Sequence, residues 1–179
     1  MFHSGMRRTL MEEVTLTEML DARERRVSIQ THLLKQHKLP IICLTLNIPG
    51  PVKVFSQIPD AYDEGCRRIH FLLTQQKFPV IDFIETKDKT GYEAFFSVNA
   101  SASDLKKAMV TIEDQDRLGR LFDIDVLDTD GRKLSREEFG LTPRLCLICD
   151  RPAHECSRSR AHSVPELTKQ IQKILNERL

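Results

Sequence analysis

The chain has 179 residues, of which 40% are hydrophobic, so it is long enough to bury the core of one domain. Its 27 basic and 26 acidic residues give a formal net charge of +1, which excludes a global electrostatic attraction to nucleic acid or to an acidic membrane surface. We find no apolar run of membrane-spanning length and expect no secretory signal. We therefore expect a cytoplasmic protein, in which five cysteines, an odd number, indicate thiols or a metal site rather than a disulfide framework.

The N-terminal part predicts a helix followed by a buried strand. We expect the first eleven residues to be flexible and residues 15–36 to form an amphipathic helix, because Thr15 and Glu18 make the T-x-x-E box that caps a helix. The apolar residues on one side of this helix are Leu16, Met19, Leu20, Val27 and Leu34. Residues 41–48 are apolar, rich in β-formers and bounded by prolines, which is typical of a buried strand.

Strands and helices then alternate along the chain. Asp60 can cap a helix that continues to about residue 76, and residues 80–85 and 92–98 predict the two strands of a hairpin. A helix capped by Ser101 or Ser103 reaches about residue 113, and a further strand follows within 118–128. A short helical turn at 135–138 and a last helix over 166–175 complete the prediction.

The order of strand, helix, strand, strand, helix and strand over residues 41–128 is typical of a ferredoxin-like βαββαβ core. We therefore predict an α+β fold with an antiparallel or mixed sheet, and packing of the helices on one face is the simplest arrangement. Residues 1–179 are predicted to form a single domain. An N-terminal helix and a C-terminal Cys/His segment with a helix are added to this core.

Residues 122–127 alternate in type, and one of the alternating sets is a pair of carboxylates. Successive side chains of a strand point to opposite faces, so the apolar set can enter a core while Asp123 and Asp125 share the other face. Two carboxylates about 7 Å apart suit one or two Mg²⁺ ions whose coordination is completed by substrate phosphates. An isolated D-x-D is more often a solvated strand face.

The residues before this strand favour the phosphate site over the solvated face. Gly119 supplies a turn without a side chain, and Arg120 supplies a guanidinium that can bind phosphate oxygens. A third carboxylate often completes such a metal site. Glu113 is the favoured candidate here, because Asp128 has the wrong strand parity, although a solvated helix end is the commoner role for a residue so placed.

The sequence Asn47-x-Pro49-Gly50-x-x-Lys53 follows the first strand. Its break in regular structure frees backbone N–H groups, and Lys53 adds a positive charge, so the loop can hold a phosphate. An ordinary strand-to-helix turn with a surface lysine explains the composition equally well.

The segment Cys146-x2-Cys149-x6-Cys156-x5-His162 supplies three thiolates and one imidazole, a set that binds structural Zn²⁺ tetrahedrally. We predict a zinc knuckle over residues 144–162. His154 is a poorer fourth ligand because it lies two residues before Cys156, and thiols without a metal are the alternative. Four arginines in or beside the segment are either solvated charges or a patch that binds an anionic ligand or an acidic protein: Arg144, Arg151, Arg158 and Arg160.

Three segments together resemble one family: LGRLFDIDVL at 118–127, NIPGPVK at 47–53 and the Cys/His segment at 144–162. They are similar to the citrate lyase holo-acyl-carrier-protein synthases, which are phosphoribosyl-dephospho-coenzyme A transferases, and the similarity extends from about Leu16 to the C-terminus. The resemblance implies a Mg²⁺-dependent nucleotidyl transfer. A serine hydroxyl of the apo acyl carrier protein, the gamma subunit of citrate lyase, attacks triphosphoribosyl-dephospho-coenzyme A, and pyrophosphate is released.

The resemblance implies that Asp123, Asp125 and Arg120 are catalytic, with Mg²⁺ on the two aspartates. The substrate-binding residues that it implies are Asn47, Gly50, Lys53, Gly119, Arg158 and Arg160. Many nucleotidyltransferases place a Gly-Ser pair well upstream of the D-x-D, whereas Gly119 lies only four residues before Asp123. The resemblance therefore carries the reaction and not the polymerase-like architecture.

Two other functions stay open. Priming of a malonate decarboxylase carrier needs the same nucleotide, and the chemistry of the residues does not separate the two carriers. A ferredoxin-like sheet with a basic zinc knuckle could also serve an RNA-binding module, but the predicted strands lack the aromatic RNP pattern and only 6% of residues are aromatic. We expect neither a nucleic-acid nor a membrane partner.

Overall fold

The structure is a computed structural model that describes residues 11–178, so the flexibility expected for the first eleven residues lies almost entirely outside the described part. Its α-helices and strands are α1 (Leu16–His37), β1 (Ile41–Leu46), α2 (Ile58–Gln75), β2 (Val80–Asp88), β3 (Gly91–Val98), α3 (Ala102–Asp114), β4 (Phe122–Leu127), α4 (Ala153–Ser159) and α5 (Val164–Arg178). Two 3₁₀ turns are η1 (Gly119–Leu121) and η2 (Glu137–Phe139). Within the described residues, no helix has the length and apolarity needed to cross a membrane.

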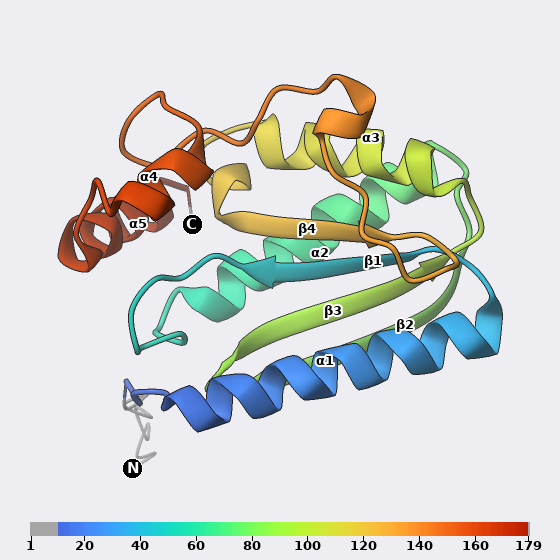
Figure 1. Ribbon diagram of the computed structural model, residues 1–179, viewed down its shortest axis with the longest axis horizontal. Coiled ribbons are helices and arrows are strands. Elements are labelled where there is room, and N and C mark those ends of the chain that lie inside the picture. The colour runs from blue at the N-terminus through green and yellow to red at the C-terminus, as the bar shows by residue number, and fades with distance from the viewer. Residues whose placement is uncertain (1–10, 179) are drawn as a thin grey trace, which may run out of the picture.

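The four strands form one sheet in the order β2-β3-β1-β4, and every neighbouring pair is antiparallel. The prediction of an α+β fold with an antiparallel sheet is thus confirmed. In the edge pair of β1 and β4, Leu46 at the end of β1 lies opposite Phe122 at the start of β4. The loop after β1 and the turn before β4 therefore meet at one end of the sheet, where α4 and α5 also lie (Figure 1).

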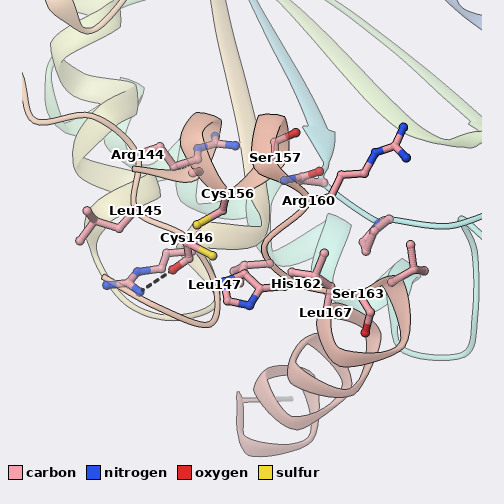
Figure 2. Close-up of a pocket in the computed structure, with 15 residues that line it drawn as sticks. Arg144, Leu145, Cys146, Leu147, Cys156, Ser157, Arg160, His162, Ser163 and Leu167 are labelled. Carbon is pink, nitrogen blue, oxygen red and sulfur yellow. Dashed lines mark hydrogen bonds between the residues drawn. The ribbon is translucent and has the colours of Figure 1, made fainter. Parts of the chain in front are cut away.

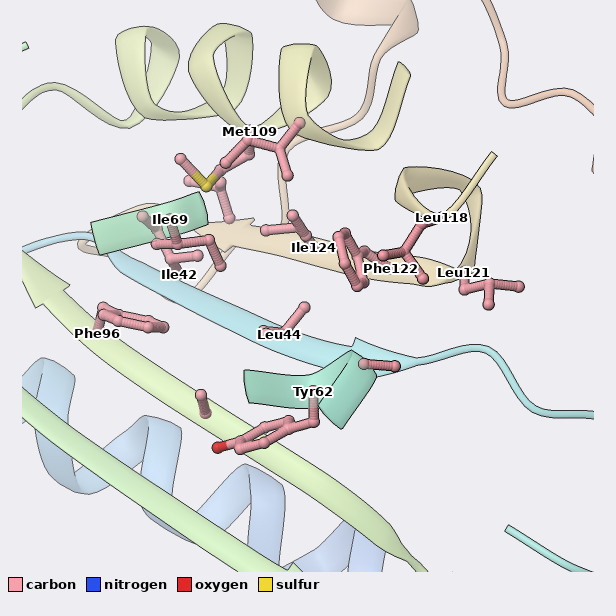
Figure 3. Close-up of a cluster of buried hydrophobic side chains, with 14 of the residues drawn as sticks. Ile42, Leu44, Tyr62, Ile69, Phe96, Met109, Leu118, Leu121, Phe122 and Ile124 are labelled. Atoms are coloured by element: carbon pink, nitrogen blue, oxygen red, sulfur yellow. The ribbon is translucent and has the colours of Figure 1, made fainter. Parts of the chain in front are cut away.

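The main core lies between one face of the sheet and helices α2 and α3 (Figure 3). Phe122, Ile124 and Val126 of β4 are fully buried in it, as their alternation predicts, beside Leu44 of β1 and Tyr62 of α2. Burial of apolar surface at about 25 cal/mol per Å² is the dominant favourable contribution to folding. The apolar set of β4 therefore fixes which way the two aspartates point.

Helices α2 and α3 share one face, as expected for the core of residues 41–128, and the added helix α1 packs on the opposite face (Figure 1). Leu33 packs there against Ile41, Cys43 and Phe95, a patch of apolar residues that water would otherwise contact. The capping box at Thr15 is confirmed.

The apolar face predicted for α1 is wrong at Leu16, Leu20 and Val27, whereas Leu34 packs against the cluster around Leu33. Leu16 and Val27 are 76% and 59% exposed, whereas Ala22 and Leu33 are buried. The N-terminal half of the inward side carries charge, since Arg26 on it pairs with the buried Glu93 of β3. A search for apolar periodicity assigns such a charged inward side to solvent.

The other differences concern element ends. Helix α2 begins at Ile58, with Pro59 in its first turn, rather than after an Asp60 cap. Strand β2 extends to Asp88, and α5 is longer at both ends than residues 166–175. Helix α4 was not predicted, because seven residues are too few to show a helical period.

Gly119 lies where the turn before β4 passes the end of α3. It is buried, and its N–H donates to Asp116 Oδ1 at 2.8 Å. A Cβ at this position would lie 2.3 Å from Ile112 O and 2.8 Å from Glu113 O, which are backbone atoms that cannot turn away. The close approach of two backbones therefore requires glycine here.

We predict that Gly119→Ala destabilises the protein by about 1–3 kcal/mol, the usual cost of overpacking, measured by urea unfolding. The reason is the clash with the last turn of α3. Unchanged unfolding together with weakened nucleotide binding would contradict this packing role and favour direct contact of Gly119 with phosphate.

Candidate active site and metal centre

The two aspartates of β4 lie on the sheet face that α1 only partly covers. Asp123 is opposite Thr45 of β1 and Asp125 is opposite Cys43. Both side chains are partly exposed, as the strand alternation predicts. Lys133 donates to Asp125 Oδ1 at 2.7 Å, and Arg144 lies 3.3 Å from Asp123 Oδ1.

The electrostatics of this pair favour a bound cation. Burial raises the pKa of Asp125, and the neighbouring Asp123 carboxylate raises it further, while Lys133 opposes the shift. Two carboxylates on one strand face repel each other, and a divalent cation with oxygen ligands removes that repulsion. The donor set therefore fits Mg²⁺, completed by phosphate or water oxygens.

A cavity of about 220 Å³, which we call the sheet pocket, lies between α1 and this face of the sheet. Asp123 lines it together with Asn47 and Lys53, so two of the predicted phosphate-binding residues reach the same cavity as the D-x-D. Arg23 and Arg26 of α1 also line it, and the sequence analysis missed them because contacts between α1 and the sheet are non-local.

Glu93 of β3 is a further carboxylate that the sequence analysis did not identify. It is buried, lines the sheet pocket and accepts a hydrogen bond from Arg26 Nε at 2.7 Å. Since Ala94 pairs with Leu44, Glu93 lies in the same cross-strand row as Thr45 and Asp123. An acidic residue inside an otherwise apolar strand is the sequence signal that could have indicated it, because buried carboxylates need a partner.

Glu113, the favoured third metal ligand, has a different environment. Its Oε1 accepts from the backbone N–H of Ile124 at 2.8 Å and from Arg144 at 2.6 Å, and its Oε2 accepts from Arg136. The side chain is only 4% exposed. This geometry does not favour a metal-ligand role, since both oxygens are engaged by the chain itself; Glu113 instead joins α3 to β4 and to the segment before the knuckle.

The predicted zinc ligands come together. One ligand atom from each of Cys146, Cys149, Cys156 and His162 lies within 4.8 Å of the others. The Cys149 sulfur is 3.4 Å from the Cys156 sulfur and 3.3 Å from His162 Nε2. A tetrahedron with Zn–S bonds of about 2.3 Å separates its sulfurs by about 3.8 Å, so the set fits the ion.

The local backbone explains this convergence. Cys146 and Cys149 lie on a turn closed by the hydrogen bond from Cys146 N to Arg151 O, and Cys156 lies on α4. The backbone N–H of Arg151 and the His162 ring lower the pKa of the Cys149 thiol to about 6. A thiolate, which zinc requires, is therefore accessible at neutral pH.

A second cavity of about 450 Å³, the knuckle pocket, lies beside these ligands (Figure 2). Arg120 and Arg160, two predicted functional residues, line it, and Arg120 also donates to Cys146 O at 3.4 Å. Arg158 is exposed and lines neither pocket. Gly50 adopts φ +79° next to Val164 at the start of α5, which places the loop after β1 against the C-terminal part of the chain.

Comparison with known proteins identifies the family. The family described as apo-citrate lyase phosphoribosyl-dephospho-CoA transferase matches residues 14–178. A protein of Vibrio cholerae serotype O1 (strain M66-2), named a probable apo-citrate lyase phosphoribosyl-dephospho-CoA transferase, is 41% identical over 92% of this chain and 93% of its own. A transferase of the same name from Escherichia coli O1:K1 is 34% identical over 92% of this chain and 90% of its own.

The chain belongs to the apo-citrate lyase phosphoribosyl-dephospho-CoA transferase family. The family resemblance seen in the sequence is thereby confirmed, and the protein is an enzyme of the transferase class. The matched region contains both pockets, the D-x-D strand and the Cys/His segment. The site residues can therefore be considered as parts of one phosphoribosyl-dephospho-CoA transferase.

We predict that Glu113→Gln lowers stability by about 3–5 kcal/mol, because it removes the buried counter-ion that Arg136 and Arg144 share and leaves them only the more exposed Asp114 and Asp123. The Tm should fall by on the order of 10 °C, measured by calorimetry with and without Mg²⁺. An unchanged Tm combined with a higher Mg²⁺ requirement would contradict this structural role and return Glu113 to the metal site.

We predict that the purified protein contains one zinc per chain by elemental analysis and that Cys149→Ser loses it. Because binding energy of a structural zinc is folding energy, the variant should melt more than about 5 °C earlier. Cys66→Ser, which changes a cysteine outside the cluster, should keep the metal. Metal-free wild-type protein with full activity and an unshifted Tm would rule the zinc site out.

Proposed function

We propose that this protein transfers the phosphoribosyl-dephospho-coenzyme A group from triphosphoribosyl-dephospho-coenzyme A to a serine of the apo acyl carrier protein of citrate lyase. The proposal rests on family membership and on one observation. A strand-borne carboxylate, Asp123, lines the same cavity as three cations, Arg23, Arg26 and Lys53. Carboxylates beside cations suit a metal-bound polyphosphate, which brings its own negative charge into the site.

The reaction forms a bond between the serine Oγ and the α-phosphorus and breaks the bond from that phosphorus to the β-phosphate bridging oxygen. Pyrophosphate leaves, and the serine proton passes to solvent. Asp123 and Asp125 would hold Mg²⁺, which would supply charge neutralisation for the attacking and leaving oxygens. Lys53 and Arg120 bind phosphate oxygens and align them, the larger part of what phosphoryl transfer asks of a protein. Asn47, Gly50 and Gly119 shape the loops that carry these cations.

The scaffold belongs to the same proposal. We infer that β1, α2, β2, β3, α3 and β4 form a ferredoxin-like unit, and the strand order β2-β3-β1-β4 supports this. Residues 1–179 then make one transferase domain, with α1 on its second face and a zinc-bound knuckle at the end where β4 begins. A reducing cytoplasm would keep the knuckle thiols available for the metal, and we place the reaction there.

The citrate lyase carrier is preferred over a malonate decarboxylase carrier because both the family and the similar proteins are named for citrate lyase. Both carriers would present a serine to the same nucleotide, so the acceptor is decided by protein contacts and not by the D-x-D chemistry.

The test is the intact mass of purified apo carrier after incubation with this protein, Mg²⁺ and triphosphoribosyl-dephospho-coenzyme A. We expect the carrier mass to rise by one phosphoribosyl-dephospho-coenzyme A group, and we expect one pyrophosphate to be released into solution for each carrier modified. Asp123→Asn and Asp125→Asn should each slow transfer by about 10²-fold or more, while the fold is retained because both side chains are partly exposed.

Asp130→Asn changes an exposed turn aspartate near the end of the same strand and is the matched control, for which wild-type rates are expected. Full activity of either D-x-D variant would remove the metal assignment. The proposed function is rejected if the citrate lyase carrier stays unmodified and the protein instead modifies a malonate decarboxylase carrier or binds RNA tightly.

A further inference from the structure

We propose that the nucleotide binds across two cavities that meet at Asn47: its triphosphate occupies the sheet pocket, and its dephospho-coenzyme A part occupies the knuckle pocket. This assignment of subsites rests on the proposed function. It gives a binding role to Arg23 of α1 and makes the knuckle a wall of the nucleotide site.

The sheet pocket has the size and charge of a polyphosphate site. At about 220 Å³ it is smaller than most organic-ligand sites. Its three cations exceed the two carboxylates, Glu93 and Asp123, that also line it. Arg26 is engaged by Glu93, whereas the Arg23 guanidinium forms no ion pair with another described residue.

Arg23 and Lys53 are close enough to repel each other. Burial lowers the pKa of Lys53, and the positive charge of Arg23 lowers it further. Lys53 Nζ is held in this position by donating to Ile48 O at 2.6 Å. Two like charges held at one cavity are stabilised by an anion between them, and a triphosphate supplies several negative charges.

The knuckle pocket has the chemistry of a nucleotide base with its diphosphate. At about 450 Å³ it falls within the range of small-molecule sites. Its apolar walls are Leu145, Leu147, Ala153, Val164 and Leu167. Three arginines, Arg120, Arg144 and Arg160, line it, and no carboxylate does so among the described residues.

The three arginines differ in how free they are to bind a ligand. Arg144 is held by Glu113 and by Phe122 O, and Arg120 donates to Cys146 O. Arg160 forms no ion pair with any residue that the structure describes. Figure 2 shows it on the loop between α4 and α5, which also carries His162 and Ser163. Arg160 is therefore the cation of this pocket with its charge most available.

The two cavities are joined where the chemistry would occur. Asn47 lines both of them. Arg144 of the knuckle pocket lies 3.3 Å from Asp123 Oδ1 of the sheet pocket. A nucleotide with its triphosphate on one side and its adenosine diphosphate on the other places the ribose and the α-phosphorus at this junction, next to the metal carboxylates. The bond that breaks then leaves pyrophosphate alone in the sheet pocket.

The assignment is tested by equilibrium binding of two partial ligands to the zinc-loaded full chain with Mg²⁺: 3′-dephospho-coenzyme A and inorganic triphosphate. Arg160→Asn removes the charge while asparagine tolerates the left-handed backbone at this position, φ +50°. This variant should weaken the binding of 3′-dephospho-coenzyme A by about tenfold or more and leave the affinity for triphosphate unchanged. Arg23→Ala should weaken the binding of triphosphate and leave the affinity for 3′-dephospho-coenzyme A unchanged.

Each variant has a matched control: for Arg23 it lies on the same helix, α1, and for Arg160 it lies on the next helix, α5. Arg25→Ala removes a cation of α1 that pairs with Asp88 outside the pocket. Lys169→Asn removes an exposed cation of α5 close to Leu167. Both should bind the two probes as the wild type does, and melting curves exclude variants that have lost their fold.

The assignment is overturned if wild-type protein does not bind 3′-dephospho-coenzyme A, if both variants weaken both probes equally, or if a control weakens a probe as much as its pocket variant. Failure of the proposed function gives a different result. A carrier that stays unmodified while the two probes separate as expected would reject the transfer reaction but leave the two nucleotide subsites in place.

Discussion

The buried carboxylate of Glu113 is the interaction on which the active end of the molecule depends. It accepts from the free backbone N–H of Ile124 at the sheet edge, and it neutralises Arg136 and Arg144, which come from the chain after β4. Arg144 also pairs with Asp123, and the first knuckle cysteine, Cys146, follows Arg144 by two residues in the chain. A single ionised group therefore joins α3, the D-x-D strand and the knuckle. Breaking such a buried network costs more than any one of its contacts contributes, because the remaining charges stay buried.

The two faces of strand β4 differ: one faces the core under α2 and α3, and the other, which we call the chemical side, carries Asp123 and Asp125. Its apolar residues are fixed by the core under α2 and α3, so the register that buries Phe122 and Ile124 also presents the aspartates. On the chemical side, α1 covers the sheet with apolar contacts only around Leu33. Its N-terminal half presents arginines instead, and the sheet pocket lies between those arginines and the sheet.

The parts of this arrangement that sequence predicts are those with local causes. The strand alternation, the cap at Thr15 and the cysteine spacing each depend on neighbours a few residues apart, and the structure agrees with all three. Arg23, Arg26 and Glu93 were missed because their meeting depends on how α1 crosses the sheet. The partners of Glu113 lie 11 to 31 residues away, a separation at which no periodic pattern distinguishes a buried network from a solvated helix end.

The burial pattern of the knuckle explains what a metal ion would contribute beside the proposed transfer site. In residues 144–162 only Cys146 and Cys156 are buried, so the segment has too little apolar surface to fold by burial alone. A tetrahedral zinc would supply the missing cross-links, because four side chains on a turn, a helix and a loop are fixed by one ion. The same fixation would position Arg160, whose backbone conformation is left-handed and which lies two residues before His162. An exposed arginine loses side-chain entropy when it binds phosphate, and a rigid backbone beneath it reduces the remaining loss. The zinc would thus act on nucleotide binding through geometry, while in the proposed function the positive charge for the reaction would come from Mg²⁺ held at the D-x-D.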